Sequence, residues 1–267
     1  MSLKRRREKL LDFDINKLLE IIYEAGDIAL EIYNQEDKNI RTKHDNSPVC
    51  DGDIAVHDFL LEKLSALHSD IPLVSEEDHW NKAERLKLKE YWLVDPIDGT
   101  RAFISHDNGE FTINLAFISN KRPTLGIIYA PYHKVCYYAS KNQGAYKIQD
   151  GQTKKLPLGE RKNVYISKVH FSSKSKAFVE QLEERNGKFD IIRLHSSLKL
   201  CKVAEYRGCI YPKLGDTSEW DTAAGDIILF EAGAEIIDQS TNKPPLYNKD
   251  SLLNNHFIAK DKNLRLF

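Results

Sequence analysis

The sequence has no long hydrophobic run and few cysteines. No apolar segment approaches the roughly 20 residues that a membrane-spanning helix needs, and the chain begins without an apolar signal segment. The four cysteines, Cys50, Cys136, Cys201 and Cys209, form no C-x-x-C pair and show no zinc-ligand spacing. We therefore expect a cytoplasmic protein with reduced thiols and no transmembrane segment.

An excess of charge of either sign is also missing. The 267 residues include 39 Lys and Arg and 40 Asp and Glu, which gives a formal net charge of -1 at pH 7. Such a balance does not attract the whole chain to nucleic acid or to an anionic membrane. The basic run Lys4-Arg5-Arg6-Arg7 is better explained as a solvated N-terminus than as a phosphate or lipid contact. We expect no nucleic-acid partner; peripheral association with the inner face of the cell membrane, and the choice between monomer and homodimer, stay open.

The sequence does contain the pattern of a two-part globular fold, with 41% hydrophobic and 30% charged residues. Apolar residues at helical spacing predict helices over residues 14–34 and from residue 53, and β-branched and aromatic runs over 111–148 predict an antiparallel meander. A polar stretch at 150–163 indicates a boundary. Beyond it, strands and helices alternate: strands near 164–167, 189–194, 208–212, 234–238 and 256–260, and helices near 174–185, 197–206 and 221–232. We expect an α+β part with an antiparallel sheet over residues 1–155 and an α/β part over residues 156–267.

The most informative stretch is Asp95-Pro96-Ile97-Asp98-Gly99-Thr100, which follows the apolar strand pattern of residues 91–94. A turn at this point can direct both carboxylates and the Ile97 carbonyl at one position, and oxygen ligands suit a hard divalent cation. The three-residue spacing of the acids does not fit an EF-hand loop, nor the D-x-D spacing of phosphatases that form an aspartyl-phosphate. An ordinary polar β-turn remains the alternative.

Further acids stand at the ends of other predicted elements. Glu76 and Glu77 follow a short strand at 71–75, Asp53 lies near the start of the second helix, and Asp221 lies in the first turn of the helix over 221–232. Asp53 and Asp221 have a plain structural explanation, because a carboxylate in a first helical turn can cap free amides or interact favourably with the helix dipole. The repetition of this arrangement favours a shared site.

Taken together, the acidic motifs resemble the lithium-sensitive, magnesium-dependent phosphatases of the inositol monophosphatase superfamily, over nearly the whole chain. The resemblance is greatest to its bacterial CysQ branch of 3'(2'),5'-bisphosphate nucleotidases. It implies a layered α-β-α-β-α sandwich. It depends on Ser47-Pro48-Val49 ahead of Asp53, Leu73-Val74-Ser75-Glu76-Glu77-Asp78, the turn at 95–100, Ser196-Ser197-Leu198-Lys199, Tyr211-Pro212-Lys213 and the stretch from Glu219 to Gly225.

The resemblance also implies a set of magnesium ligands. One Mg²⁺ would be bound by Glu76, Asp95 and the carbonyl of Ile97, and a second by Asp95, Asp98 and Asp221, with a third ion on Glu76 as an option. Scattered acids without a closed cage suit Mg²⁺, which keeps several waters and binds through few carboxylates.

Catalytic and substrate roles follow from the same resemblance. The nucleophile would be a water on the first ion, positioned and deprotonated by Thr100 with Asp53 behind it, and Glu77 would support the ligands. A helix cap is the plain explanation of Thr100. The amides of Gly99 and Thr100 would contact the phosphate.

The nucleotide end of the substrate would be bound by four further side chains. His170, Ser196, Lys199 and Lys213 match positions that contact the second phosphate and the nucleoside, although each has a solvated side chain as its alternative.

The expected reaction is hydrolysis of the 3'-phosphate of adenosine 3',5'-bisphosphate to AMP and phosphate, a reaction of sulfur metabolism and nucleotide recycling. Leu214 replaces a hydroxyl-binding glutamate of the inositol phosphatases, which argues against a polyol. An inositol or sugar monophosphatase, and a non-catalytic metal or nucleotide sensor, remain alternatives. Three departures from the family pattern, Cys50, Asp51 and His195, have no assigned effect.

Overall fold

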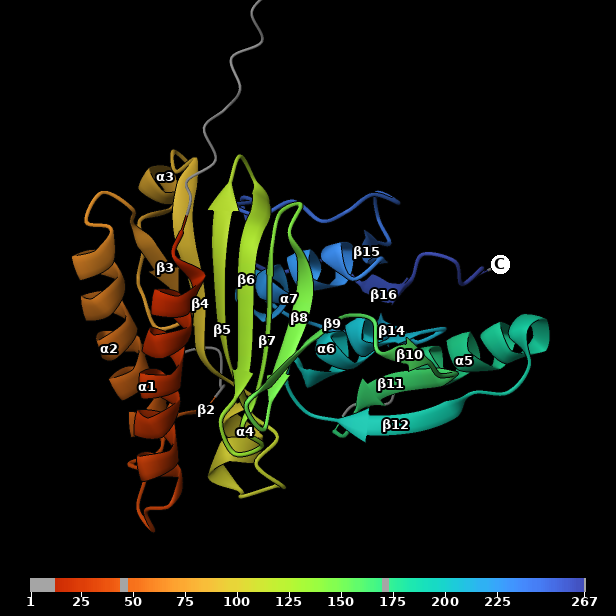
Figure 1. The fold of residues 1–267 in the computed structure, drawn as a ribbon, viewed down its shortest axis with the longest axis horizontal. Coiled ribbons are helices and arrows are strands. Elements are labelled where there is room, and N and C mark those ends of the chain that lie inside the picture. Colours follow the sequence, from red (N-terminus) through yellow and green to blue (C-terminus); the bar gives the residue numbers. More distant parts are fainter. Residues whose placement is uncertain (1–12, 44–47, 170–172, 267) are drawn as a thin grey trace, which may run out of the picture.

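Helices and sheets alternate in five layers across the molecule (Figure 1). The structure is a computed structural model that describes residues 13–43, 48–169 and 173–266. The layering confirms the expected α-β-α-β-α sandwich. In order, the layers are α1 (Ile15–Tyr33) with α2 (Asp51–Leu67), a seven-stranded sheet, α6 (Leu198–Glu205) with α7 (Glu219–Glu231), a five-stranded sheet, and α5 (Ser173–Asn186).

Helices α1 and α2 cover one face of the seven-stranded sheet. Asp14 caps α1, because its side chain accepts a hydrogen bond from the Asn16 amide at 3.1 Å. The apolar stripe of α1, including Leu18 and Ile22, is buried in one cluster with residues of α2 and the sheet. The amphipathic pattern therefore predicted this layer correctly.

The seven-stranded sheet carries the order β3-β4-β5-β6-β7-β8-β9 and is antiparallel except for the parallel pair β3 and β4. The polar stretch predicted as a boundary contains a strand, β9, which is exposed at every residue and forms the edge of the sheet. An edge strand without a buried face has no apolar alternation, so the pattern did not indicate it. The strands are β3 (Leu73–Ser75), β4 (Glu90–Asp98), β5 (Thr112–Ser119), β6 (Arg122–Ala130), β7 (Val135–Ser140), β8 (Gly144–Gln149) and β9 (Gln152–Lys155).

Strand β4 runs further than the sequence indicated. The expected turn after Val94 is wrong: β4 continues to Asp98, and its pairing with β5 shifts register between Asp95 and Asp98. In a regular strand, residues three apart point to opposite faces. The irregularity, in which Pro96 has no amide to donate, changes this alternation and brings both carboxylates to the same side.

The five-stranded sheet has the order β12-β11-β14-β16-β15 and is mixed. Its β12-β11-β14 half is parallel, and β16 pairs antiparallel with both β14 and β15. The alternation of strands and helices therefore predicted this part well, within about two residues at each boundary. The strands are β11 (Asn163–Ser167), β12 (Asp190–Leu194), β14 (Ile210–Lys213), β15 (Ala234–Asp238) and β16 (Phe257–Asp261).

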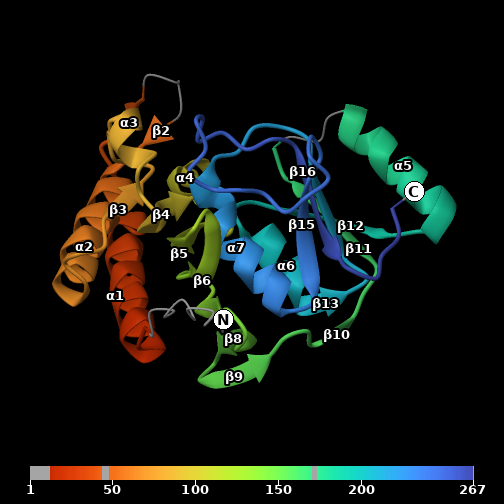
Figure 2. The same cartoon turned by 90° about the horizontal axis from the view of Figure 1, so that it is seen from above.

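Helix α7 lies in the middle of the molecule, between the two sheets (Figure 2). It approaches the seven-stranded sheet closely at Gly126 of β6, where an added Cβ would stand 2.5 Å from the carbonyl oxygen of Ala224. The helix ends at Glu231, and Gly233, two residues later, has a φ of 85°, the left-handed conformation expected of a glycine that follows a helix. Because α7 packs on the sheet of residues 1–155, the proposed division at residue 155 separates parts that share one core.

The remaining elements are short. They are α3 (Lys82–Arg85), α4 (Thr100–Ile104), and the two-residue strands β1 (Arg41–Thr42), β2 (Pro48–Val49), β10 (Gly159–Glu160) and β13 (Tyr206–Arg207). All four cysteines are buried and free, as expected. Over the described ranges, none of the helices combines the length and the apolar character needed to cross a membrane.

Candidate metal-dependent active site

Three carboxylates from distant parts of the chain meet at the end of β4. Asp95, Asp98 and Asp221 each offer an oxygen, and these oxygens lie within 4.8 Å of one another. The first two come from the irregular end of β4, and the third comes from the first turn of α7. The sequence-based prediction that these acids share one site agrees with this geometry.

The charge balance of this cluster fits a bound cation. Burial, followed by the nearby charges of Glu76 and Asp98, raises the pKa of Asp95 well above its usual range, and its Oδ1 atom is buried without a hydrogen bond. Burial and the charge of Asp98 raise the pKa of Asp221 to about 8. A cation bound between these carboxylates would supply the positive charge that the buried Asp95 and the nearby Asp221 lack. Their oxygen donors are those that Mg²⁺ prefers.

Helix geometry positions Asp221. Its Oδ2 atom accepts a hydrogen bond from the Ser218 amide at 2.8 Å, so the side chain caps α7 as its plain explanation required. A carboxylate has two oxygens with several lone pairs. Asp221 can therefore cap α7 and also contribute an oxygen to the acidic cluster.

Asp98 is fixed by residues that the sequence analysis did not single out. Its Oδ2 atom accepts hydrogen bonds from the Ser197 amide at 2.6 Å, from the Ser197 hydroxyl at 2.5 Å and from Asn114 Nδ2 at 3.2 Å. The Thr112 hydroxyl lies 3.5 Å away. Ser197 is part of the motif Ser-Ser-x-Lys, but nothing in its spacing indicated a contact with Asp98 at the end of β4.

Glu76 and Glu77 lie beside the cluster and share an ammonium group. Lys43 Nζ lies 2.8 Å from Glu76 Oε1 and 2.6 Å from Glu77 Oε1. Burial raises the pKa of Glu76, against the opposing effect of Lys43. Glu76 interacts electrostatically with Asp95 but is not within the group of three close acids, so its role as a magnesium ligand stays a prediction. Lys43, which no motif indicated, is the cation that pairs with Glu76 in this structure, so a Mg²⁺ ion bound by Glu76 would lie close to its ammonium group.

Thr100 connects the end of β4 to α2. Its hydroxyl lies 3.3 Å from Asp53 Oδ1 and 3.1 Å from the carbonyl of Ile97, the carbonyl expected to bind metal. The cap position of α4 is occupied by Gly99, with φ of 94°, so the alternative of Thr100 as the helix cap is wrong. Burial raises the pKa of Asp53, although hydrogen bonds from Cys50 oppose this.

Two of the three departures from the family pattern lie near this contact. The amide and thiol of Cys50 lie 2.8 Å and 3.0 Å from Asp53 Oδ2, and burial raises the pKa of the thiol to about 12. Cys50 therefore orients Asp53 as a neutral donor. Asp51 is exposed and accepts hydrogen bonds from Asn39 and Arg41, so it points away from the acids.

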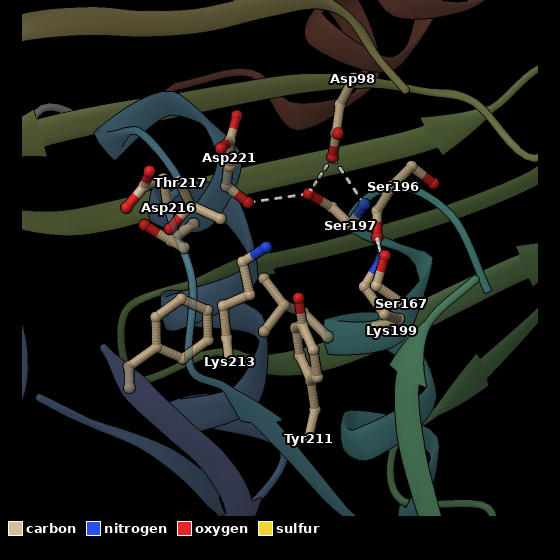
Figure 3. A pocket seen from close by; sticks show the side chains of 13 residues that line it. Asp98, Ser167, Ser196, Ser197, Lys199, Tyr211, Lys213, Asp216, Thr217 and Asp221 are labelled. Carbon is tan, nitrogen blue, oxygen red and sulfur yellow. Dashed lines mark hydrogen bonds between the residues drawn. The ribbon is translucent and has the colours of Figure 1, made fainter. Parts of the chain in front are cut away.

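A cavity of about 190 Å³ opens beside Asp98 and Asp221 (Figure 3). Ser196, Lys199 and Lys213 line it, together with Tyr211 of β14. The alternative of a solvated surface side chain is wrong for Lys199, which is buried and donates hydrogen bonds to the carbonyls of Leu194 and Ser196. Burial lowers the pKa of Lys199 to about 8, and burial also lowers the pKa of Lys213.

A second cavity of about 350 Å³ adjoins the first, since Ser167, Tyr211, Lys213 and Asp216 line both. Leu214 lines this second cavity and presents an apolar surface there. His170 lies outside the described residues.

The third departure, His195, lies at the loop before α6. Its Nε2 atom lies 2.8 Å from Asp107 Oδ2, and its amide donates to Glu110 Oε2 at 3.0 Å. Lys168 also pairs with Asp107, at 2.7 Å. His195 therefore connects the loop before α6 to the segment that follows α4.

The chain resembles known proteins over nearly its whole length. Residues 11–266 match the inositol monophosphatase family. The 3'(2'),5'-bisphosphate nucleotidases CysQ of Salmonella typhimurium and Escherichia coli K12 are 38% and 37% identical to the chain over 246 and 247 residues, covering 91% of this chain and 98% of theirs. The crystal structure of CysQ from Bacteroides thetaiotaomicron has a TM-score of 0.82 and 32% identity, and covers 95% of this chain and 99% of that chain. The fold also matches the IMPase of Thermotoga maritima, with a TM-score of 0.71 and 23% identity over 92% of this chain and 91% of that one. The chain therefore belongs to the inositol monophosphatase family.

Proposed function

We propose that the protein is a Mg²⁺-dependent phosphomonoesterase that hydrolyses the 3'-phosphate of adenosine 3',5'-bisphosphate, giving AMP and inorganic phosphate. The observation that carries this proposal is the convergence of Asp95, Asp98 and Asp221 within 4.8 Å, beside a cavity lined by two lysines. The names of the CysQ relatives support the nucleotide as substrate.

The acidic cluster would bind the metal. Asp95, Asp98 and Asp221 would hold Mg²⁺ between β4 and α7, and Glu76 with the Ile97 carbonyl would complete a second position. When bound, Mg²⁺ supplies positive charge that stabilises the charge developing on the phosphoryl group and on the leaving oxygen. The number of ions, two or three, is part of this proposal.

Thr100 and Asp53 would activate the attacking water. With its proton donated to Asp53 Oδ1, the Thr100 hydroxyl presents a lone pair that can accept a hydrogen bond from water. As the water oxygen attacks phosphorus, its proton passes to Thr100 and the threonine proton passes to Asp53. The ester bond to the 3'-oxygen breaks, that oxygen takes a proton from solvent water, and Asp53 then returns its proton to solvent, so the reaction consumes one water in total. Glu77 would act indirectly, by fixing Lys43.

Lys199 and Lys213 would bind the 5'-phosphate, with Ser196 as a further donor, whereas the amides of Gly99 and Thr100 would contact the reacting 3'-phosphate. An ammonium that has been taken out of water interacts strongly with a phosphate dianion. Lys199 is buried and Lys213 is half-buried, and both line the cavity that contains Asp98 and Asp221. His170 remains a proposed contact to the nucleoside.

A substrate panel tests the proposal. Release of phosphate would be measured from adenosine 3',5'-bisphosphate, 3'-AMP, inositol 1-phosphate and fructose 1,6-bisphosphate, each with Mg²⁺ and with EDTA. We expect the bisphosphate nucleotide to give the highest kcat/KM and EDTA to abolish release. A higher kcat/KM for the inositol or sugar ester would show that this ester, and not the nucleotide, is the preferred substrate. If no ester released phosphate, a non-catalytic sensor would be favoured. The proposed setting is the cytoplasm, with inner-membrane association and oligomeric state as separate predictions.

A further inference from the structure

Ser197 is the residue at which the metal cluster and the substrate cavity meet. It is 3% exposed and stands immediately before α6, next to Ser196 and two positions before Lys199. Its hydroxyl oxygen lies 2.5 Å from Asp98 Oδ2 and 2.8 Å from the backbone carbonyl of Asp221 (Figure 3). Its amide donates to the same Asp98 oxygen at 2.6 Å. One side chain therefore contacts the end of β4 and the first turn of α7.

Asn114 of β5 contacts both Ser197 and Asp98. Its Nδ2 atom lies 3.0 Å from Ser197 Oγ and 3.2 Å from Asp98 Oδ2, and the residue is 1% exposed. An amide has two protons, so it can donate to both oxygens at once. The serine hydroxyl has one proton, which can go to Asp98 or to the Asp221 carbonyl but not to both at the same time. The hydroxyl proton can therefore alternate between an acceptor on β4 and an acceptor on α7.

The hydrogen bonds are all made to one side of the Asp98 carboxylate. Among the described residues, Ser197, Asn114 and Thr112 all contact Oδ2, and none of these contacts uses Oδ1. A carboxylate fixed through one oxygen presents the other in a defined direction. Groups that orient a metal ligand in this way commonly change metal affinity by about 10- to 100-fold when they are removed.

We propose that Ser197 is a positioning residue, which fixes the spacing between Asp98 and Asp221 so that both carboxylates reach one divalent cation. This inference depends on the proposed function, because it assumes that these two acids bind metal. It goes further by assigning the spacing between Asp98 and Asp221 to a residue of the segment 196–199, which the proposed function places at the substrate. Movement of the Ser196–Lys199 segment on binding a phosphate ester would then act directly on the metal ligands.

The test measures metal binding without turnover. Mg²⁺ affinity would be determined by calorimetry, and Mn²⁺ affinity by electron paramagnetic resonance, for wild type, Ser197→Ala and Ser196→Ala. We expect Ser197→Ala to weaken binding about 10- to 100-fold. We expect Ser196→Ala, the adjacent and chemically identical change, to leave metal affinity near the wild-type value. In rate assays, Ser197→Ala should raise the Mg²⁺ concentration for half-maximal rate, while the substrate KM at saturating Mg²⁺ changes little.

The outcomes separate the two proposals. Absence of metal binding by the wild type would overturn the proposed function. Wild-type binding together with unchanged affinity in Ser197→Ala would overturn only the positioning role. If Ser197→Ala does not fold, Ser197→Thr should preserve affinity and Asn114→Leu should lower it, and the reverse order would also contradict the role.

Discussion

The hydroxyl of Thr100 lies 3.3 Å from Asp53 Oδ1, although 47 positions of sequence separate the two residues. The contact joins the first turn of α2 to the start of α4. Cys50 donates to the other oxygen of Asp53, so the carboxylate has one oxygen for Thr100 and one for the helix start. Asp53 can therefore cap α2 and still receive a proton from Thr100.

Replacing Asp53 by Asn tests this proton path. The amide retains the shape of the side chain but cannot accept a proton, so we expect kcat to fall by about 10²- to 10⁴-fold, as for loss of a general base. The substrate KM and the affinity for Mg²⁺ should change much less. Steady-state kinetics at saturating Mg²⁺, with the melting temperature as a check on folding, would measure this.

Asp51→Asn is the matched control for that experiment. Asp51 is in the same helical turn but is exposed and pairs with Arg41, and exposed pairs contribute little to stability. Its kcat should remain close to that of the wild type. A similar loss of kcat in both variants would indicate a general defect of the α2 start and would remove the argument for Asp53 as the base.

The raised pKa of Asp221, about 8, predicts how pH affects stability without metal. Because the folded state raises the pKa of this acid, its contribution to stability is complete below its unfolded pKa of about 4 and is lost as pH rises to about 8. In EDTA, Asp221→Asn should therefore gain melting temperature relative to wild type between pH 5 and pH 8.5. At this chain size each 1 kcal/mol corresponds to roughly 2–4 °C.

Added Mg²⁺ should reverse that order. The wild type should be stabilised by Mg²⁺, and more strongly at pH 8.5 than at pH 5, because binding requires ionised carboxylates. Asp221→Asn should respond weakly to Mg²⁺ at either pH. Differential scanning calorimetry with and without Mg²⁺ would measure both effects, and a melting temperature of the wild type that is insensitive to Mg²⁺ at pH 8.5 would contradict the metal assignment.

Much of this site could be predicted because acids at the ends of predicted elements are visible in a sequence. Asp95, Asp98 and Asp221 each follow or begin an element, and the structure places them together. The side chains that orient them were not predictable in the same way. Lys43 and Asn114 contact the acids only because of long-range packing, and neither has a local spacing that indicates it.

The fold shows the same division between local and long-range signals. The amphipathic stripe of α1 was predicted from its helical period, and the meander was predicted from continuous β-branched and aromatic runs, which suit a strand such as β5 that is buried on both faces. Edge strand β9 is exposed on both faces and carries no such period. The extension of β4 to Asp98 depends on an irregular pairing with β5, which a sequence with Pro96 in this place does not suggest.

Lys199 should make binding of the second phosphate dependent on pH. Burial lowers its pKa to about 8, so the side chain carries its positive charge below pH 8 and loses it above. We expect kcat/KM for adenosine 3',5'-bisphosphate to fall as pH rises through this value, since kcat/KM reports the free enzyme. Lys199→Met should lower kcat/KM by about 10- to 100-fold, as expected for loss of a charged hydrogen bond, and should remove this step in the pH profile.

The matched comparison for Lys199 uses a smaller substrate. 3'-AMP has no 5'-phosphate, so its kcat/KM should be nearly the same in wild type and in Lys199→Met. Equal losses for both substrates would place Lys199 at the reacting phosphate instead, or would indicate a role in packing beside Tyr211.

Gly126 determines how closely α7 can approach the seven-stranded sheet. An added Cβ would stand 2.5 Å from the Ala224 carbonyl and 2.6 Å from the side chain of Ile227, so Gly126→Ala must push α7 away from β6. Overpacking of this kind costs about 1–3 kcal/mol, and α7 carries Asp221. We expect a lower melting temperature together with weaker Mg²⁺ binding, measured by calorimetry.

Gly159→Ala is the control, because no atom lies within 4 Å of its added Cβ, and it should change neither quantity. A Gly126→Ala protein that loses stability but binds Mg²⁺ with wild-type affinity would show that the position of α7 does not limit the metal site.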